Sequence, residues 1–325
     1  MTSPIWFFFL AVASGFALLV WGADRLVYGA SASARNLGVS PLVIGLTIVG
    51  FGTSAPEMVV SAVAALQGNP GLADGNAIGS NIANIGLILG CAALAQPLTV
   101  KSETLRREYP LMFAVMLFTV LLMLDLSLSR LDGMLLLAGL VGLTILVVRL
   151  GLRQNCRDPM VAEYDSEIPR RVPMGRALLW LGLGLGVLLV SSRILVWGAV
   201  NIARAMGVSD FIIGLTIVAI GTSMPELAAS VMSAVKKEHD IALGNILGSN
   251  MFNLLAVLGL SAVISPHRLE PLILQRDMVA MVVFSIGLFI MGFGFRADGR
   301  INRWEGALLL FAYLGYLLVL WRSVL

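Results

Sequence analysis

Long apolar runs recur along the whole chain and constrain its fold more than any other feature. Each is about 18–25 residues long, enough for a helix to cross a hydrocarbon core about 30 Å thick. The runs are continuous rather than alternating, so they predict helices and not the strands of a barrel. Charged residues make up 13% of the 325 positions, about half of their share in soluble domains. The sequence therefore predicts an all-α polytopic membrane protein.

Ten transmembrane helices are expected from these runs. Their approximate ranges are 5–23, 42–66, 76–95, 109–126, 132–149, 176–197, 211–235, 241–264, 278–295 and 304–321. No lysine or arginine precedes the first run. We therefore interpret it as a retained span and not as a cleaved signal peptide, which carries a basic segment in front.

Basic residues gather in the loops that follow the odd-numbered spans. These loops hold Arg35, Lys101, Arg106, Arg107, Arg149, Arg153, Arg157, Arg170, Arg171, Arg176, Lys236, Lys237, Arg296, Arg300 and Arg303. The other loops hold Arg130, Arg204, Arg268 and Arg276. By the positive-inside rule, the basic loops are expected in the cytoplasm and both termini outside. The net charge of +3 then reflects topology, and no nucleic-acid partner is expected.

The chain contains an internal repeat. Residues 42–90 align with 211–259 without a gap, and about 22 of the 49 aligned positions are identical. The first copy reads "IGLTIVGFGTSAPE" and "GNAIGSNIANIGLILG", and the second reads "IGLTIVAIGTSMPE" and "GNILGSNMFNLLAVLG". All membrane helices share leucine, isoleucine and valine. Glutamate, asparagine, proline, threonine and serine shared in register indicate a duplication instead.

Each copy holds five predicted spans, and an odd number makes the two copies cross the membrane in opposite directions. The expected fold is therefore ten helices in two inverted five-helix repeats. The first repeat covers 1–150, with its polar motifs at 45–90, and the second covers 176–325, with its motifs at 214–259. The charged segment 151–175 between them is predicted to be a cytoplasmic linker.

Two glutamates fall near the middle of the second and seventh spans, Glu57 and Glu226. A carboxylate at this depth costs at least about 2.5–3.5 kcal/mol on insertion scales. Neither span holds a lysine or arginine that could pair with it. One alternative is a protonated glutamate that donates to a neighbouring helix. Because the two glutamates stand at matching places in inverted repeats, we favour a shared cation.

Hydroxyl groups share the helix face of each glutamate. Thr53 lies four residues and Ser54 three residues before Glu57, so their oxygens point the same way. The second copy repeats the pattern with Thr222, Ser223 and Glu226. Carboxylate and hydroxyl oxygens are hard ligands, the preference of calcium and sodium rather than of zinc or copper.

A proline in each motif loosens the backbone beside these side chains. Pro56 has no N–H, so the carbonyl of Gly52 loses its helical hydrogen bond, and Pro225 does the same to Gly221. We expect both spans to bend here. A freed carbonyl inside a membrane must find a cavity, an ion or another donor.

The following spans carry a polar stripe with a step of four residues. It consists of Asn76, Ser80 and Asn84 in the first copy and of Asn245, Ser249 and Asn253 in the second. Such residues can also act as polar glue between helices, at about 0.6 kcal/mol per hydrogen bond. We expect the neighbouring Asn81 and Asn250 to act as such glue, by hydrogen bonding between helices. The same role is an open alternative for Asn76 and Asn245.

The doubled motifs "GTSAPE…GSNIAN" and "GTSMPE…GSNMFN" resemble those of the calcium/cation antiporter superfamily, in particular its prokaryotic sodium/calcium exchanger branch. The resemblance covers the full chain. It implies alternate occupation of one cluster of sites by sodium and calcium, with the first span of each repeat sliding or tilting. Calcium would lie between Glu57 and Glu226 with help from Thr53 and Thr222. The sodium sites would use Ser54, Ser80, Ser223 and Ser249, and the backbone carbonyls of Gly50 and Ala219, while Asn84 and Asn253 would face the centre.

The resemblance implies no cofactor beyond the transported ions, no obligate protein partner, and a place in a prokaryotic plasma (inner) membrane. One position departs from the pattern, because several exchangers carry aspartate where this chain has Asn253. Two carboxylates balance one calcium ion but leave a net positive site with three sodium ions. The departure therefore puts the usual stoichiometry in doubt and argues against potassium co-transport.

The expected function is secondary sodium/calcium antiport, with calcium/proton antiport as the main alternative. A passive channel is a further alternative. An intramembrane protease would need a nucleophile with a base, or a metal held by histidines. The chain has no GxSxG motif, and both histidines, His239 and His267, fall in predicted loops. Cys91 and Cys156 have no spacing typical of a disulfide or a zinc site. We therefore do not expect an enzyme.

Overall fold

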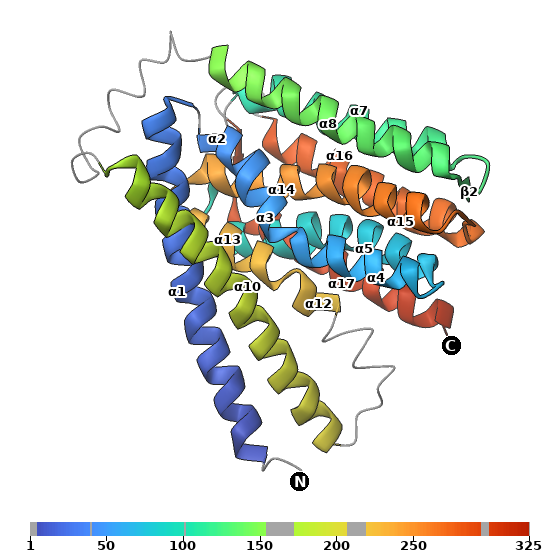
Figure 1. Ribbon diagram of the computed structural model, residues 1–325, viewed down its shortest axis with the longest axis horizontal. Coiled ribbons are helices and arrows are strands. Elements are labelled where there is room, and N and C mark those ends of the chain that lie inside the picture. Colours follow the sequence, from blue (N-terminus) through green and yellow to red (C-terminus); the bar gives the residue numbers. More distant parts are fainter. Residues whose placement is uncertain are drawn as a thin grey trace.

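The computed structural model describes residues 5–39, 41–100, 102–153, 172–206, 219–293 and 299–324. Within these ranges the architecture is all-helical, with two very short strand pairs (Figure 1). The prediction of an all-helical fold is confirmed. Most of the predicted linker 151–175 and the first part of the predicted span 211–235 lie outside the described residues.

The first half of the chain forms eight α-helices and two π-helical segments within the described residues. They are α1 (Ile5–Leu37), α2 (Pro41–Ile44), η1 (Gly45–Val49), α3 (Gly50–Thr53), α4 (Ala55–Leu66), α5 (Pro70–Ala83), η2 (Asn84–Leu89), α6 (Gly90–Ala95), α7 (Ser102–Met123) and α8 (Arg130–Arg153).

The second half repeats the helix break, the rod with its π-helical segment and the two outer helices within the described residues. Its described helices are α10 (Met174–Ala205), α12 (Ala219–Thr222), α13 (Met224–Val235), α14 (His239–Phe252), η5 (Asn253–Val257), α15 (Leu258–Ile264), η6 (Ile273–Met278), α16 (Val279–Gly292) and α17 (Arg303–Val324). Strand β1 (Leu98–Val100) pairs with β4 (Gly299–Ile301), and β2 (Ser127–Leu128) pairs with β3 (His267–Arg268), both antiparallel. Each pair joins one half of the chain to the other.

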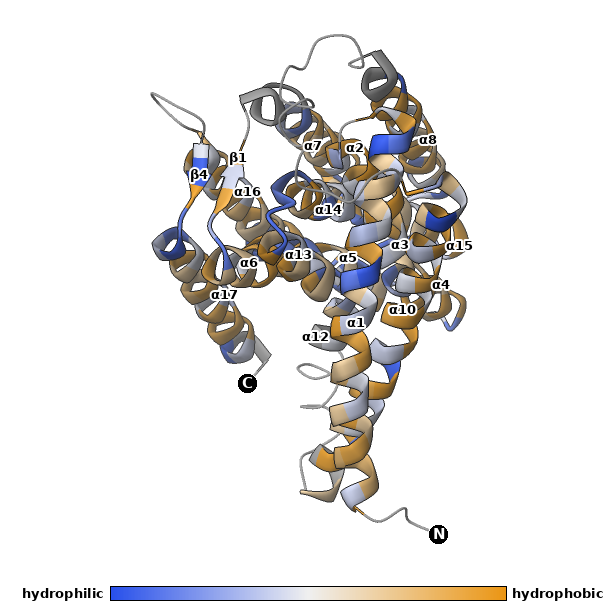
Figure 2. Ribbon diagram, turned by 90° about the vertical axis from the view of Figure 1, so that its left-hand side faces the viewer, coloured by the Kyte–Doolittle hydropathy of each residue, from blue (hydrophilic) through white to orange (hydrophobic). Residues whose placement is uncertain are grey.

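Seven of the described helices are long and apolar enough to cross a membrane, or eight if the bent pair Pro41–Thr53 and Ala55–Leu66 is one span. Two shorter apolar helices, Glu108–Met123 and Met224–Val235, fall where the fourth and seventh spans are expected. The total of ten spans remains a prediction. Figure 2 shows that most residues of the helices are apolar, as expected for membrane-spanning segments.

Two rods lie at the centre of the molecule. In α5–α6 (Pro70–Ala95), 78% of the most apolar stretch is buried, and in α14–α15 (His239–Ile264) the share is 89%. The other candidate spans reach at most 33%. These two rods carry the polar stripes, so the fold encloses the stripes instead of exposing them to lipid.

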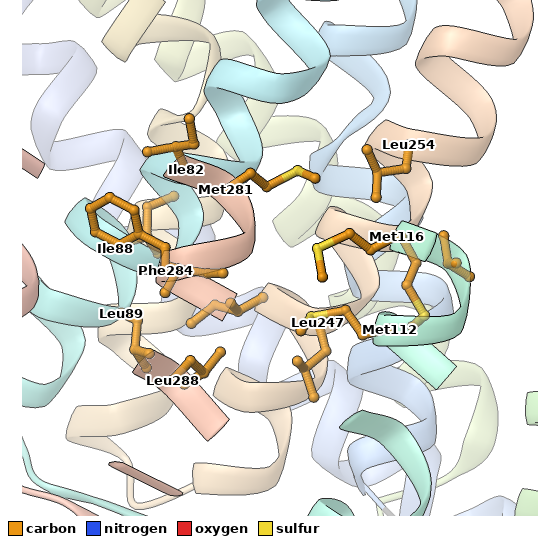
Figure 3. Close-up of a cluster of buried hydrophobic side chains, with 14 of the residues drawn as sticks. Ile82, Ile88, Leu89, Met112, Met116, Leu247, Leu254, Met281, Phe284 and Leu288 are labelled. Atoms are coloured by element: carbon orange, nitrogen blue, oxygen red, sulfur yellow. The ribbon is translucent and has the colours of Figure 1, made fainter. Parts of the chain in front are cut away.

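An apolar core packs around the central rods (Figure 3). Ile82, Ile88 and Leu89 come from the α5–α6 rod, and Leu247 and Leu254 come from the α14–η5 segment. Outer helices close the core with Met112 and Met116 of α7 and with Met281, Phe284 and Leu288 of α16. Unbranched methionine fills irregular gaps between helices well. The core thus fixes the rods from the outside and leaves their polar sides facing each other.

Helices α1 and α10 pack along each other, and one end of this pair extends away from the other helices (Figures 1 and 2). Gly15, Gly22 and Gly29 recur every seven residues on α1 and lie against Leu195, Leu188 and Leu181 of α10. The residue numbers of the contacts fall along α10 as they rise along α1, so the two helices are antiparallel. A Cβ on Gly29 would lie only 2.3 Å from the backbone nitrogen of Leu181, which shows why glycine is needed at this seam.

Helix α1 continues to Leu37, well beyond the end expected near residue 23. The charges that suggested an end lie within the helix and have partners there. Lys236 lies 2.7 Å from the Asp24 carboxylate, and the Arg25 guanidinium lies over the rings of Trp21 and Trp180. The helix therefore extends beyond the predicted span, and these contacts allow it to carry charge.

Candidate ion-binding site

Each GTSxPE motif forms a break in its helix at the serine. Helix α3 ends at Thr53, Ser54 is a turn residue, and α4 begins at Ala55 with Pro56 as its second residue. The two parts are bent by 42°. Ser223 separates α12 from α13 in the same way. The predicted bend at Pro56 is confirmed, because proline can begin the second helix but cannot continue the first.

The carbonyl freed beside Pro225 has a hydrogen-bond donor. Ser192 on α10 donates its hydroxyl to the Gly221 carbonyl at 3.1 Å. The corresponding position on α1, 169 residues earlier, is Ala23, whose side chain has no donor. The two halves therefore differ at the carbonyl that the proline releases.

The two glutamates meet at the centre and are bound crosswise. Ser54 donates its hydroxyl to Glu226 Oε1 at 3.1 Å, and Ser223 donates to Glu57 Oε1 at 3.3 Å. Glu57 is 1% exposed and Glu226 is 2% exposed. Figure 1 shows α3–α4 and α12–α13 running in opposite directions, so the two motifs approach each other from opposite ends.

Five oxygen atoms around this pair accept no hydrogen bond from any described residue. They are Glu57 Oε2, Glu226 Oε2, Asn84 Oδ1, Asn253 Oδ1 and Ser249 Oγ, all buried. A buried acceptor without a partner costs roughly 1–3 kcal/mol, and more if it is charged. Because the atoms are oxygens and two belong to carboxylates, a hard cation would satisfy them.

Asn76 and Asn245 hold each stripe helix against its motif helix. Asn76 donates to Ser61 Oγ at 3.0 Å and to the Glu57 carbonyl at 3.3 Å. Asn245 donates to Ser230 Oγ at 2.9 Å and to the Glu226 carbonyl at 3.4 Å. The structure thus gives both asparagines the role of structural glue, which the sequence had left open.

The remaining stripe asparagines join the two halves to each other. Asn84 donates to Asn250 Oδ1 at 2.9 Å, and Asn253 donates to Asn81 Oδ1 at 3.1 Å. Asn81 in turn donates to the Asn250 carbonyl at 3.1 Å. The expected glue role of Asn81 and Asn250 is confirmed. Asn84 and Asn253 each use the amide nitrogen for this contact and keep the amide oxygen free.

Most of the predicted ligands are buried. Thr53 is buried and donates to Asn245 Oδ1 at 3.0 Å, and Ser80 and Ser249 are buried as well. Thr222 is partly exposed. The Gly50 carbonyl already accepts the Ser54 N–H at 3.1 Å, and Ala219 opens helix α12 at the edge of the described residues.

Sequence reasoning missed Ser61, Ser230 and Ser192. Ser61 and Ser230 are identical in the two copies and lie four residues after each glutamate, so the repeat itself held a signal for them. Ser192 has no counterpart in the first half, and its contact depends on how α10 packs against α12.

A partly buried histidine–aspartate pair joins β3 to α5. His267 Nε2 of β3 lies 2.6 Å from Asp74 Oδ2, and its Nδ1 lies 2.8 Å from the Ser265 carbonyl. Burial disfavours the charged ring of His267, but Asp74 and the Ser265 carbonyl outweigh it, and the pKa of His267 is raised above 6.5. The second repeat has Leu243 at the position of Asp74, so the pair breaks the symmetry.

A family model described as sodium/calcium exchanger protein matches residues 7–149 and 176–322. The chain belongs to the sodium/calcium exchanger family. The first matched segment ends just before the predicted linker, and the second begins just after it. As a member of this family of transporters, the protein is a multi-pass integral membrane protein and not an enzyme, as expected.

Several relatives match this family member over nearly their whole length. It is 50% identical over 312 residues to the CaxA protein of Alkalimonas amylolytica, covering 96% of this chain and 98% of that one. It is 42% identical to inner membrane protein YrbG of Escherichia coli strain K12, with 95% of each chain covered. It is 33% identical to sodium/calcium exchanger MaX1 of Methanosarcina acetivorans, covering 96% and 98%.

A solved structure of the sodium-calcium exchanger NCX_Mj, soaked without Na⁺ and Ca²⁺, is similar to this exchanger-family chain with a TM-score of 0.81. The two share 31% sequence identity, and the match covers 98% of this chain and 100% of the other. The likeness extends across both halves, so the chain has the exchanger fold.

Proposed function

We propose that this protein is a secondary active sodium/calcium antiporter that exchanges Ca²⁺ for Na⁺ at a mid-membrane site. The observation that carries the proposal is the crossed pair of Glu57 and Glu226, each bound by a serine of the other half and each with one unpaired oxygen. Two buried carboxylates without an ion pair to any described lysine or arginine match the charge of one divalent cation. The similarity to sodium/calcium exchanger MaX1 supports the same function.

In this proposal calcium binds between the free oxygens of Glu57 and Glu226. Thr53 and Thr222 assist from the preceding turn of each motif. Sodium binds to the hydroxyls of Ser54, Ser80, Ser223 and Ser249 and to the backbone carbonyls of Gly50 and Ala219. The free amide oxygens of Asn84 and Asn253 face the same space and add neutral ligands.

Antiport requires that the site open to one side at a time, and the packing supports a division into a fixed and a moving part. The ligand-bearing rods are deeply buried and bound across the halves by asparagines. Helices α1 and α10 pack closely along each other, and one end of this pair extends away from the other helices (Figure 2). We propose that this pair moves against the rods, and that Asp24 and Lys236, which join α1 to the end of α13, separate or re-form as it does.

The proposal also covers placement in the cell. We propose two inverted repeats at 1–150 and 176–325, a cytoplasmic linker at 151–175, both termini outside, and a prokaryotic plasma membrane. The described loops after odd-numbered spans carry the basic residues on which this orientation rests, among them Lys236, Lys237 and Arg303.

Calcium/proton antiport is the competing function, because Asn253 leaves the site with two carboxylates where several exchangers have three. The deciding experiment uses purified protein in sodium-loaded liposomes, with calcium uptake measured after dilution into sodium-free buffer, with and without a pH gradient. Uptake that needs internal sodium and is abolished by Glu57→Gln is the expected result. Uptake that follows the pH gradient and ignores sodium would overturn it, and uptake that needs no counter-ion would indicate a channel.

A further inference from the structure

An apolar groove of about 630 Å³ lies directly behind the turn that carries Thr53 and Ser54. Its walls come from three spans and from one residue of the second rod. They are Thr47, Ile48, Phe51, Gly52 and Ala55 of the second span, Leu140, Val141, Thr144 and Ile145 of α8, Leu185 and Leu189 of α10, and Phe252 of α14. None of the proposed cation ligands lines this groove.

The chemistry of the lining specifies a hydrocarbon occupant. The two hydroxyls in the wall are already used within their own helices, because Thr47 donates to the Val43 carbonyl at 2.6 Å and Thr144 donates to the Leu140 carbonyl at 2.8 Å. A polar ligand would therefore lose its hydrogen bonds to water without replacement, at a cost of roughly 1–3 kcal/mol per group.

The mouth of the groove is open to the membrane. The exposed fraction is 40% for Ile48, 48% for Phe51, 59% for Val141 and 47% for Ile145, and at this depth the surrounding solvent is lipid hydrocarbon. The groove is lined by residues on both sides of the helix break at the middle of the second span. This position is far from either membrane–water interface. A lipid chain reaches this depth, whereas a lipid head group does not.

The groove is short compared with a transmembrane helix of a second copy. One turn of a helix about 10 Å wide and 5.4 Å long already fills about 400 Å³. The groove therefore seats scarcely more than one turn, although its volume is within the range of about 300–1,000 Å³ that is typical of small-molecule sites.

We propose that this groove is a binding site for one acyl chain of a membrane phospholipid. The chain lies against Phe51 and Phe252, whose rings meet edge to face at 5.5 Å and connect the motif helix to the second rod. It fills what would otherwise be an apolar void between the ion-site turn and α10, where Gly52 already touches Leu185. The occupant thus supports the back of the turn that presents Thr53 and Ser54 to the site.

The test uses photo-crosslinking in vesicles of phosphatidylethanolamine and phosphatidylglycerol. One probe is phosphatidylglycerol with a diazirine at the middle of an acyl chain, and a second carries the diazirine on its head group. Labelled peptides are then mapped by mass spectrometry. We expect the acyl probe to label the segments 47–55 and 140–145 several-fold more than the lipid-facing residues Leu121 of α7 and Phe311 of α17, and the head-group probe to leave them unlabelled.

A groove-filling variant provides the matched comparison. Val141→Trp places a large side chain in the mouth, whereas Leu121→Trp makes the same change at an equally exposed position of α7 outside the groove. We expect Val141→Trp to reduce labelling of segment 47–55 several-fold and Leu121→Trp to leave it unchanged.

Equal labelling of the groove and of the outer lipid-facing residues would overturn the proposal. So would groove labelling that Val141→Trp does not reduce, or crosslinks in segment 140–145 that lead to a second copy of the chain. If Val141→Trp does not fold, labelling of the unchanged protein by the acyl-chain probe, compared with labelling by the head-group probe, still tests the proposal. Because none of these readouts involves transport, the result is independent of the proposed ion exchange.

Discussion

Ser54 of the first half donates its hydroxyl hydrogen to Glu226 of the second half at 3.1 Å, across 172 residues of sequence. The mirror contact, Ser223 to Glu57 at 3.3 Å, has nearly the same length. Each half therefore supplies the carboxylate of one contact and the hydroxyl of the other. A cation bound at the remaining carboxylate oxygens would touch both halves at once.

Replacement of either glutamate by glutamine should abolish exchange without unfolding the protein. Glu57→Gln and Glu226→Gln each remove half of the negative charge from the proposed calcium site, and we expect uptake to fall at least about 100-fold, or about 2.7 kcal/mol. Two buried like charges repel each other, so thermal stability without ions should be equal or higher. Glu305→Gln, in the first turn of α17, is the control. A glutamine variant that exchanges at the native rate would refute the site.

Loss of a bridging hydroxyl should affect sodium more than calcium. In Ser54→Ala and Ser223→Ala the carboxylates remain, but a proposed sodium ligand is removed, and a lost contact of about 1–1.5 kcal/mol corresponds to roughly tenfold in affinity. We expect the half-saturating sodium concentration to rise about that much and the calcium value to change much less. Ser14→Ala, whose hydroxyl bonds to its own helix, serves as the control. Equal effects on both ions would argue for a purely structural bridge.

The seam between α1 and α10 should tolerate no added methyl group at its contact points. A Cβ on Gly184 would lie 2.3 Å from the backbone nitrogen of Leu26, whereas one on Gly186 would meet nothing within 4 Å. Gly184→Ala should therefore destabilise the protein by about 1–3 kcal/mol, as overpacking typically does. Gly186→Ala, two residues along the same helix, should not. Thermal unfolding of both variants in detergent, compared with the unchanged protein, tests this, and identical curves would contradict the packing.

The His267–Asp74 pair should make stability depend on pH with a defined sign. Because the pKa of His267 is raised in the folded protein, its contribution is fully present below the unfolded pKa of about 6.5. The contribution is lost as the pH rises through the higher folded pKa. The stability difference between the unchanged protein and His267→Gln should therefore shrink with rising pH. His239→Gln is the control, and a difference that grows or stays constant with pH would exclude a charged pair.

Much of the fold and site could be predicted from the sequence because both depend on local pattern and on repetition. The length of the apolar runs predicted an all-helical membrane fold. The positions of Pro56 and Pro225 predicted helix breaks beside the glutamates. Register between the copies indicated that Glu57 and Glu226 are equivalent, since unrelated membrane helices have no reason to share buried polar residues. These features follow from backbone hydrogen bonding and from the cost of polar groups in lipid.

Only the tertiary structure decided which polar groups bond to each other. Ser54 binds the glutamate of the other half and not Glu57, three residues away on its own helix, because the two bent helices cross at their breaks. The same crossing pairs Asn84 with Asn250 and Asn253 with Asn81. Helical spacing specifies which side chains share a face, but not which face of a distant segment meets them. That meeting is set by how the apolar core and the glycine seam pack the helices together.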